Sequence, residues 1–415
     1  DPGRDDVREL LAQTLFEGAL SAERDQHLSR RNDLLQRMGL YDVDGERQRR
    51  WQAPARVTIA TTPPGAQVTL QQYEEDEQKR RTLLAGKVLG HTPLQTISRP
   101  PGSYLLTFEL PGRTPVRYPV LLHRAEQLHV DLALPPSAAV PNGYVYVPPG
   151  RFLFGTSSDE SVRQGFLSTV PVHEVASPAY LIGRFEVTYA DWLEYLRALP
   201  PAERAARTIH VPKGGIGGGV DLTELADGSW QLTLQPVTQA HVAGLGAMIV
   251  YRSRKVRAEQ DWQRLPVSGI GPPDILAYAE WLDRTGRVPG ARLCSEKEWE
   301  RAARGADDRE YPHGSLLDPE DANFDETYGR DVRIAGPDAV GSYPASASPF
   351  GLLDMAGNVF EWAASSLAPG ELVVRSGGYF MGAIASRSTN RTPLDPSFRD
   401  PGVGIRLCAS LPASR

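Results

Sequence analysis

The spacing of apolar residues changes along the chain. Between residues 7 and 38, Val, Leu and Met recur at helical spacing, which predicts one or two helices that begin after Asp6 and end at Gly39. From Arg56 the apolar positions alternate instead, which predicts strands. The expected strand segments are 57–59, 68–70, 104–108, 116–122 and 128–134. We therefore expect a helical lead-in over 1–52 and a small β-sandwich over 53–136.

One charged segment lies within the sandwich, and one Pro-rich segment follows it. The charged stretch 71–81 predicts a solvated hairpin tip, because charge runs usually face water. The Pro-rich stretch 135–141 predicts a hinge that leads into a main domain over 137–415.

The main domain has three helix starts and one long insert. Thr188, Pro272 and Ser295 are each followed by apolar residues at helical spacing, and Ser295 opens a capping box with Glu298. The insert spans about 200–266 and contains a glycine run at 214–219 and strand-like pieces at 230–234 and 248–252. The glycine run lacks the Gly-Lys-Ser/Thr ending of a phosphate loop, so we expect a flexible β-insert.

Composition narrows the functional classes. The 415 residues carry a formal net charge of −6 and no cluster of Lys and Arg interleaved with aromatics, which argues against a nucleic-acid partner. No apolar run has the roughly 18 residues of a membrane span. The chain opens with Asp1, so we expect an excised piece of a larger protein.

The stretch 348–362, SPFGLLDMAGNVFEW, carries two acids in an apolar run. A buried acid needs a partner, and backbone carbonyls at Gly357 and Val359 could join Asp354 and Glu361 around one hard cation. Ca²⁺ tolerates such an irregular oxygen cage best. The alternative is a pair of carboxylates that are solvated or bound by N–H groups.

The same stretch resembles the signature of formylglycine-generating-enzyme, or sulfatase-modifying-factor, domains, a calcium-binding variant of the C-type-lectin fold. Further segments match in the family's order across about 142–410. They are 150–155, 171–175, 184–188, 291–305, 311–314, 340–343, 375–378 and 402–406. The resemblance implies an α+β fold with structural Ca²⁺, and a second cation site that involves Asn323 and Asp331.

Enzymes of this family oxidise a substrate cysteine with two cysteines that hold copper. In the matching stretch this chain has Gly382 at the first cysteine position and no thiol near the second. Met381 alone cannot replace two thiolates, so we expect neither copper nor formylglycine-generating activity. The chain's two cysteines, Cys294 and Cys408, fall in other segments, and we favour two buried thiols there over one disulfide.

The absence of the two copper-binding cysteines favours a binding function over a catalytic one. The segment 379–390 carries the aromatic, small and polar residues of adaptable recognition loops, and variable members of the fold diversify the same region. The expected ligand-binding residues are Tyr379, Phe380, Met381, Ala383, Ile384, Ser386, Thr389 and Asn390. The alternative for the first three is a place in the core. We also keep two other functions open: an oxidoreductase with non-standard metal chemistry, and a structural element of the cell surface.

The parent protein is inferred from resemblance alone. Turn steps at 64–68, 90–93 and 101–104 resemble the PEGA domain. The combination is similar to the non-kinase part of large bacterial Ser/Thr kinases, although no kinase motif is present. This implies a sensor or binding region whose partner is a protein or another macromolecule. It also favours the extracytoplasmic part of a membrane-anchored bacterial protein over a cytoplasmic one.

Overall fold

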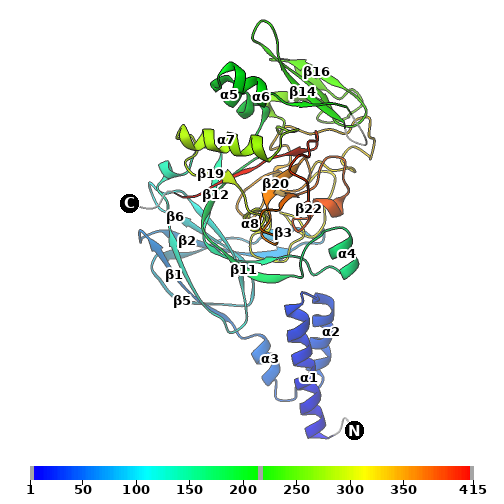
Figure 1. Ribbon diagram of the computed structural model, residues 1–415. Helices are drawn as coiled ribbons and strands as arrows, with labels where there is room; N and C mark the ends of the chain where they lie inside the picture. The colour runs from blue at the N-terminus through cyan, green and yellow to red at the C-terminus, as the bar shows by residue number, and fades with distance from the viewer. Residues whose placement is uncertain (1–3, 214–217, 412–415) are drawn as a thin grey trace.

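The computed structural model describes residues 4–213 and 218–411. Its N-terminal part consists of helices α1 (Asp5–Arg24), α2 (Leu28–Gly39) and α3 (Glu46–Trp51). Helices α1 and α2 pack side by side below the rest of the molecule (Figure 1). The predicted end at Gly39 is confirmed, whereas the predicted start after Asp6 is wrong. Asp5 and Asp6 both lie in the first turn of α1, where carboxylates favour the helix dipole.

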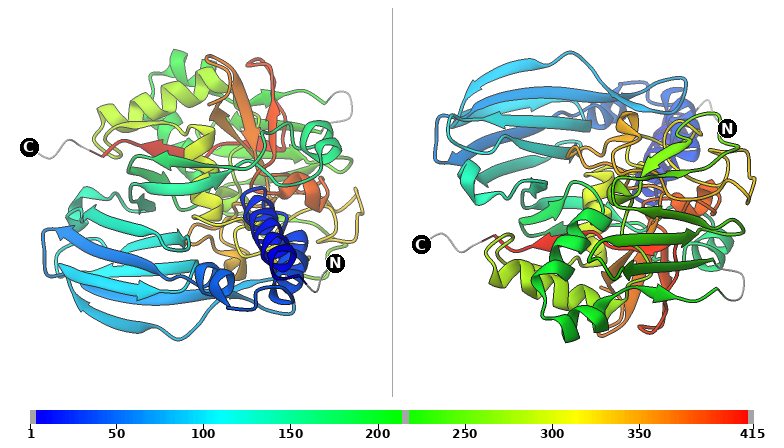
Figure 2. Two further views of the ribbon diagram at one scale, coloured as in Figure 1. Left: turned by 90° about the horizontal axis from the view of Figure 1, so that it is seen from below. Right: turned by 90° about the horizontal axis from the view of Figure 1, so that it is seen from above.

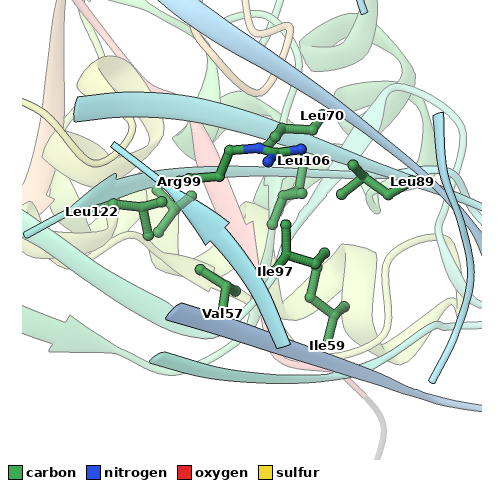
Figure 3. A pocket seen from close by; sticks show the side chains of 9 residues that line it. Val57, Ile59, Leu70, Leu89, Ile97, Arg99, Leu106 and Leu122 are labelled. Atoms are coloured by element: carbon green, nitrogen blue, oxygen red, sulfur yellow. The ribbon is translucent and has the colours of Figure 1, made fainter. Parts of the chain in front are cut away.

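The sandwich has two sheets whose strands cover the predicted segments. One sheet has the order β5-β1-β8, and the other has the order β3-β2-β6-β7 with β4 also paired to β2. Their bounds are β1 Ala55–Thr62, β2 Gln67–Glu75, β3 Arg81–Leu83, β4 Lys87–His91, β5 Leu94–Arg99, β6 Gly102–Glu109, β7 Val116–Leu122 and β8 Gln127–Ala133. Apolar side chains from both sheets meet in the space between them (Figure 3).

The charged stretch 71–81 forms the predicted hairpin tip, and Glu74, Glu75, Glu77 and Lys79 are exposed, but its two arginines are not solvated. Arg81 donates to Asp308 at 3.0 Å, Arg80 pairs with Asp321, and the Arg81 amide donates to the carbonyl of His313 at 2.8 Å. The predicted solvation is wrong for Arg80 and Arg81 alone, because these two charges have partners in the main domain, more than 200 residues away in sequence. The stretch 135–141, with the 3₁₀ helix η1 (Ser137–Ala139), is likewise a packed connection, since one apolar core runs through the sandwich and the main domain.

The main domain is built from short strands around helix α8 (Glu296–Arg304), and it lies against the sandwich (Figure 2). Its sheets have the orders β19-β24-β12-β9, β22-β21-β20-β23 and β10-β11. The bounds are β9 Tyr144–Val147, β10 Gly150–Phe154, β11 His173–Ser177, β12 Tyr180–Gly183, β19 Ala291–Leu293, β20 Phe360–Ala364, β21 Leu372–Arg375, β22 Arg391–Pro393, β23 Val403–Gly404 and β24 Leu407–Ala409. The predicted α+β class is confirmed.

The predicted helix starts are confirmed by their caps. Thr188 and Ser295 accept hydrogen bonds from the amides of Asp191 and Glu298, and each forms a capping box. The third predicted helix begins at Pro272, with Asp274 bonded back to the Gly271 amide. The helices are α4 Glu160–Gly165, α5 Tyr189–Ala198, α6 Pro201–Arg207 and α7 Pro272–Arg284.

The insert is an ordered sheet rather than a flexible segment. Strands β13 to β16 form one sheet in sequence order, and β17 pairs with β18. Trp230, on β15, and Trp262, directly after β18, are buried, so the insert is packed around its own apolar side chains and the flexible interpretation is wrong. The bounds are β13 His210–Val211, β14 Gly219–Glu224, β15 Trp230–Gln235, β16 His241–Gly244, β17 Met248–Val250 and β18 Glu259–Asp261. Of the predicted glycine run, 214–217 lies outside the described residues.

Candidate functional site

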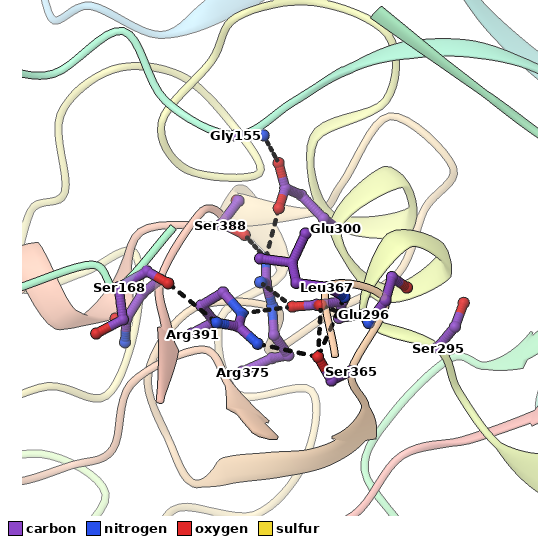
Figure 4. Close-up of polar contacts among 12 residues, drawn as sticks. Gly155, Ser168, Ser295, Glu296, Glu300, Ser365, Leu367, Arg375, Ser388 and Arg391 are labelled. Carbon is purple, nitrogen blue, oxygen red and sulfur yellow. Dashed lines mark hydrogen bonds and ion pairs between the residues drawn. The ribbon is translucent and has the colours of Figure 1, made fainter. Parts of the chain in front are cut away.

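The candidate binding loop, residues 376–390, is clamped at both ends by buried ion pairs. It leaves β21 at Arg375 and enters β22 at Arg391. Arg375 pairs with Glu300 at 2.7 Å and Arg391 pairs with Glu296 at 2.8 Å, and both acids project from helix α8 (Figure 4). A buried charge is tolerated only when it is paired in this way. Arg375 and Arg391, the two arginines that border the loop in the sequence, therefore anchor its two ends.

The loop presents a small apolar surface. Phe380 is 37% exposed and Met381 is 36% exposed, and Ala383 and Ile384 in the 3₁₀ helix η4 (Ala383–Ser386) are half-buried. Asp325 lies beside them: its amide donates to the Met381 carbonyl at 3.0 Å. An apolar centre with a charged edge is typical of protein interfaces.

The other predicted contact residues face inward. Tyr379 is 1% exposed and its hydroxyl donates to the carbonyl of Pro236, at 3.1 Å, in the insert. Asn390 is buried and its amide donates to the carbonyls of Ser376 and Ala385. Ser386 and Thr389 are also buried. These four residues support the loop from within, so that a surface role for them does not fit this structure.

Glu361 has its carboxylate fully engaged. The indole of Trp299 donates to Oε2 at 2.6 Å, and the guanidinium of Arg406 donates to both oxygens, at 2.8 Å to Oε1 and 3.0 Å to Oε2. All three side chains are buried. This arrangement is the alternative considered above, a carboxylate bound by N–H groups.

Asp354 is differently placed. Its Oδ2 accepts the Gly341 amide at 2.6 Å, while its buried Oδ1 has no hydrogen-bond partner among the described residues. Burial raises the pKa of Asp354 to about 6, the Gly341 amide and Arg406 oppose this, and Glu361 adds to it. Asp354 therefore has an oxygen that could take a cation or a proton.

The predicted oxygen cage fits a cation only in part. Asp354 Oδ1 is free to serve as a ligand, and the Gly357 carbonyl accepts only a long bond of 3.4 Å from Ser376 Oγ. Glu361 does not fit, because Trp299 and Arg406 already use its oxygens. Val359 is fully buried directly before β20, and a ligand role for its carbonyl stays a prediction.

Asn323 and Asp331, the second predicted cation pair, each have another partner, although the buried Oδ1 of Asn323 has none among the described residues. Asn323 is buried, with its amide donating to the Gly336 carbonyl at 2.9 Å. Asp331 pairs instead with Arg333 at 2.7 Å near the surface. Across residues 4–213 and 218–411, no group of three or more His, Cys, Asp or Glu side chains is arranged to hold a metal ion.

Sequence reasoning missed Glu186 as a member of the buried acid group. Its Oε1 accepts the Asn358 amide at 3.0 Å, and Oε2 lies 3.5 Å from Arg406. Burial raises the pKa of Glu186 well above its ordinary value, and Asp354 adds to the rise. The signal was present, since Glu186 is an acid between Phe185 and Val187, the same pattern that singled out Asp354.

Cys294 and Cys408 form a disulfide, so the preference for two buried thiols is wrong. Cys408 lies on β24, which pairs with β19, and Cys294 directly follows β19. The Cα atoms are 4.9 Å apart, within disulfide reach. Because these are the chain's only cysteines, no thiol is left over.

Comparison with known proteins identifies the main domain. The chain is 28% identical over 250 residues to the formylglycine-generating enzyme of Mycobacterium tuberculosis, covering 54% of this chain and 74% of that protein. It is 29% identical over 290 residues to the inactive C-alpha-formylglycine-generating enzyme 2 of Bos taurus, covering 64% and 87%. It is 28% identical over 219 residues to the serine/threonine-protein kinase pkn1 of Chlamydia caviae, covering 52% of this chain and 27% of the kinase.

Among solved structures, PvdO from Pseudomonas aeruginosa is similar, with a TM-score of 0.46 at 24% identity over 65% of this chain and 94% of that chain. The model of the sulfatase-modifying factor enzyme 1-like domain matches residues 133–411. That match covers more than half of the chain and includes the candidate loop and the buried acids. The chain belongs to the family of sulfatase-modifying factor enzyme 1-like domains.

Proposed function

We propose that the chain is a non-catalytic binding module, which recognises a protein or another macromolecule through Phe380, Met381, Ala383 and Ile384. The observation that carries this proposal is the pairing of an exposed apolar surface with rigid anchoring by Arg375. A rigid loop loses little conformational entropy when it binds, which favours recognition.

The cysteines support a non-catalytic role. Copper chemistry of the kind that the resemblance implies needs two thiolates in the loop, and this chain has Gly382 there. Its only two cysteines are used in the disulfide between Cys294 and Cys408. An inactive relative also matches the chain over 64% of its length.

A calcium ion at Asp354 belongs to the proposal as a structural support. The unpartnered Oδ1 of Asp354 supports it, whereas the engaged Glu361 limits the cage that could form. When bound there, Ca²⁺ would offset the negative charge of Asp354 and hold the 348–362 stretch to its neighbours.

The kinase relative and the disulfide support a proposal about the parent protein and its cellular compartment. The kinase match covers 27% of that protein, which supports a larger parent. A disulfide persists best in an oxidising compartment, which supports an extracytoplasmic position. Within the described residues, no helix is long and apolar enough to cross a membrane.

A retention experiment with matched variants tests the binding proposal. The immobilised chain is exposed to a cell extract, and the retained proteins are compared for the wild type, Phe380→Ser with Met381→Ser, and Leu276→Ser. Leu276 is 58% exposed on α7 and serves as the control for loss of surface apolarity. We expect the double variant alone to lose specific retention. Equal retention by all three chains would refute the surface.

The enzyme alternative is tested on the same preparation. The matched formylglycine-generating enzyme supports it, and its chemistry would require a bound redox metal and turnover of a thiol substrate. Elemental analysis and an assay of thiol oxidation decide between the two functions. Stoichiometric copper or iron with turnover would favour the oxidoreductase over the binding module.

A further inference from the structure

A cationic cleft lies between the sandwich and the main domain. It has a volume of about 310 Å³, at the lower end of the roughly 300–1,000 Å³ of small-molecule sites. Residues from β2, β3 and β7 line one side, and residues from 309–313 and 345–351 line the other. The lining residues are Tyr73, Arg80, Arg81, Thr82, Leu83, Arg117, Arg309, His313, Ala345, Ala347, Ser348, Pro349 and Gly351.

The ionisable side chains that line the cleft are basic, apart from the phenol of Tyr73. Four arginines and His313 face the cleft, and among the described residues no Asp or Glu lines it. Three of the arginines have acidic partners set behind the lining: Arg309 with Asp307, Arg81 with Asp308, and Arg80 with Asp321.

Arg117 is the cation left without a counter-charge. Its Nε donates to the Pro349 carbonyl at 2.7 Å, which fixes the guanidinium across the domain boundary. Its two terminal nitrogens have no hydrogen bond or ion pair with any residue in the described part of the chain. Those nitrogens are the donors that a guanidinium presents to the two oxygens of a phosphate or carboxylate.

Two further donors in the lining lack partners. His313 is 6% exposed and its Nε2 lies 3.0 Å from Asp321, but neither ring nitrogen has a hydrogen bond within 4–213 or 218–411. The Nε of Arg81 is also buried and unbonded. These nitrogens are buried beneath the surface of the cleft, so the exposed donors of Arg117 carry the proposal.

Tyr73 and Asp307 hold the side chain of Arg309 in place at the cleft. The guanidinium of Arg309 lies 4.6 Å from the centre of the Tyr73 ring and forms a bidentate pair with Asp307, with bonds of 2.7 Å. Tyr73 and Arg309 are both buried. The cleft is thus built before any ligand arrives, which lowers the ordering cost of binding.

We propose that this cleft binds a small molecule that carries an oxyanion group, a phosphate or a carboxylate, with Arg117 as the residue that grips the anion. The bound anion would neutralise Arg117 and join the sandwich to the main domain at the one lining arginine that lacks a counter-charge within the described residues. This site is separate from the surface formed by Phe380 and Met381 and does not depend on the binding role proposed for it.

Calorimetric titration of the full chain tests the proposal. The probes are inorganic phosphate and pyrophosphate in one arm and succinate in the other, each against chloride at equal ionic strength. We expect saturable binding in at least one arm and a tenfold or greater loss in Arg117→Gln. The arm that saturates identifies the group as phosphate or carboxylate.

The control is Arg99→Gln, because Arg99 is a half-buried sandwich arginine with no acidic partner among the described residues and lies at the other cavity, between the sheets (Figure 3). This variant should bind as the wild type does. A second variant, Ala345→Trp, obstructs the cleft from an exposed position and leaves every arginine in place. It should also weaken binding at least tenfold, and it decides the question if Arg117→Gln does not fold.

No saturable binding by the wild type, or wild-type binding by Arg117→Gln or by Ala345→Trp, would overturn the proposal. Equal weakening in Arg99→Gln would also overturn it, because the effect would then follow net charge instead of the cleft.

Discussion

Arg375 and Glu300 form an ion pair of 2.7 Å in which both side chains are fully buried. The pair ties the start of the candidate loop to helix α8, and Glu300 also accepts the Gly155 amide at 2.9 Å (Figure 4). The loop is therefore held by groups whose charges have no access to water.

Replacing Arg375 should be strongly destabilising. Arg375→Met leaves Glu296 and Glu300 with fewer counter-charges in the core, which costs about 3–5 kcal/mol when one partner of a buried pair is lost. Denaturant unfolding measures the change. Arg333→Met is the control, because Arg333 pairs with Asp331 at the surface, where an ion pair is screened by water, and its loss should change stability far less. Similar losses in the two variants would contradict the role assigned to burial.

The sequence predicted the anchors and the buried acids better than it predicted their partners. Asp354 and Glu361 stand out because acids are rare in an apolar run. Arg406, which holds Glu361, is 45 residues away, and no local pattern links the two. The burial of Tyr379 could not be predicted for the same reason, since its hydroxyl bonds to Pro236 in the insert, 143 residues earlier. Contacts between distant segments decided whether these side chains faced a cation, a ligand or the core.

The acid at 354 should make stability depend on pH. The pKa of Asp354 is raised to about 6, so between about pH 4 and 6 the folded chain keeps a proton that the unfolded chain has released. The free energy of unfolding should then fall as pH rises through this window, by at most about 3 kcal/mol for two pKa units. The neighbouring carboxylates of Glu186 and Glu361 favour the protonated form of Asp354, whereas the positive charge of Arg406 favours its ionised form.

Asp354→Asn tests this pH dependence, since the amide cannot titrate. The variant should show a shallower decline of stability between pH 4 and 6 than the wild type, measured by denaturant unfolding at each pH in the presence of a chelator. The slope from Glu186 should remain, because burial raises its pKa as well. Parallel curves for the two chains would contradict the assignment to Asp354.

Removing calcium should distinguish the role of Asp354 from that of Glu361, because only Asp354 is expected to bind the ion. If Ca²⁺ uses the free Oδ1 of Asp354, saturating calcium at neutral pH should raise the midpoint of thermal unfolding, by an amount equivalent to about 2.7 kcal/mol at a hundredfold excess over Kd. Asp354→Asn should abolish this rise. Glu361→Gln should lower stability equally with and without calcium, because Arg406 loses its partner in both cases. A wild type that does not respond to a chelator would rule out the cation.

The disulfide should be needed for stability. It closes a loop with a sequence separation of 114, and for loops of this size the chain-entropy estimate is about 4–5 kcal/mol. Changing both Cys294 and Cys408 to Ala should lower the free energy of unfolding by about that amount. Titration of the denatured, unreduced wild type should find no free thiol, whereas two thiols per chain would show that the bridge is absent.

Arg254 should control the attachment of the insert. Its guanidinium lies 3.6 Å from the Tyr251 ring and 3.8 Å from the Tyr328 ring, pairs with Asp338 at 2.6 Å and donates to the carbonyl of Gly336 at 2.7 Å. Arg254→Ala would leave Asp338 buried without this cation, at a cost of about 3 kcal/mol or more. Hydrogen exchange should accelerate in β14 to β18 and in 328–338 while the sandwich stays protected. Arg252→Ala, at an exposed position two residues earlier, should leave exchange unchanged, and equal effects from both variants would show that the insert is not held by this contact.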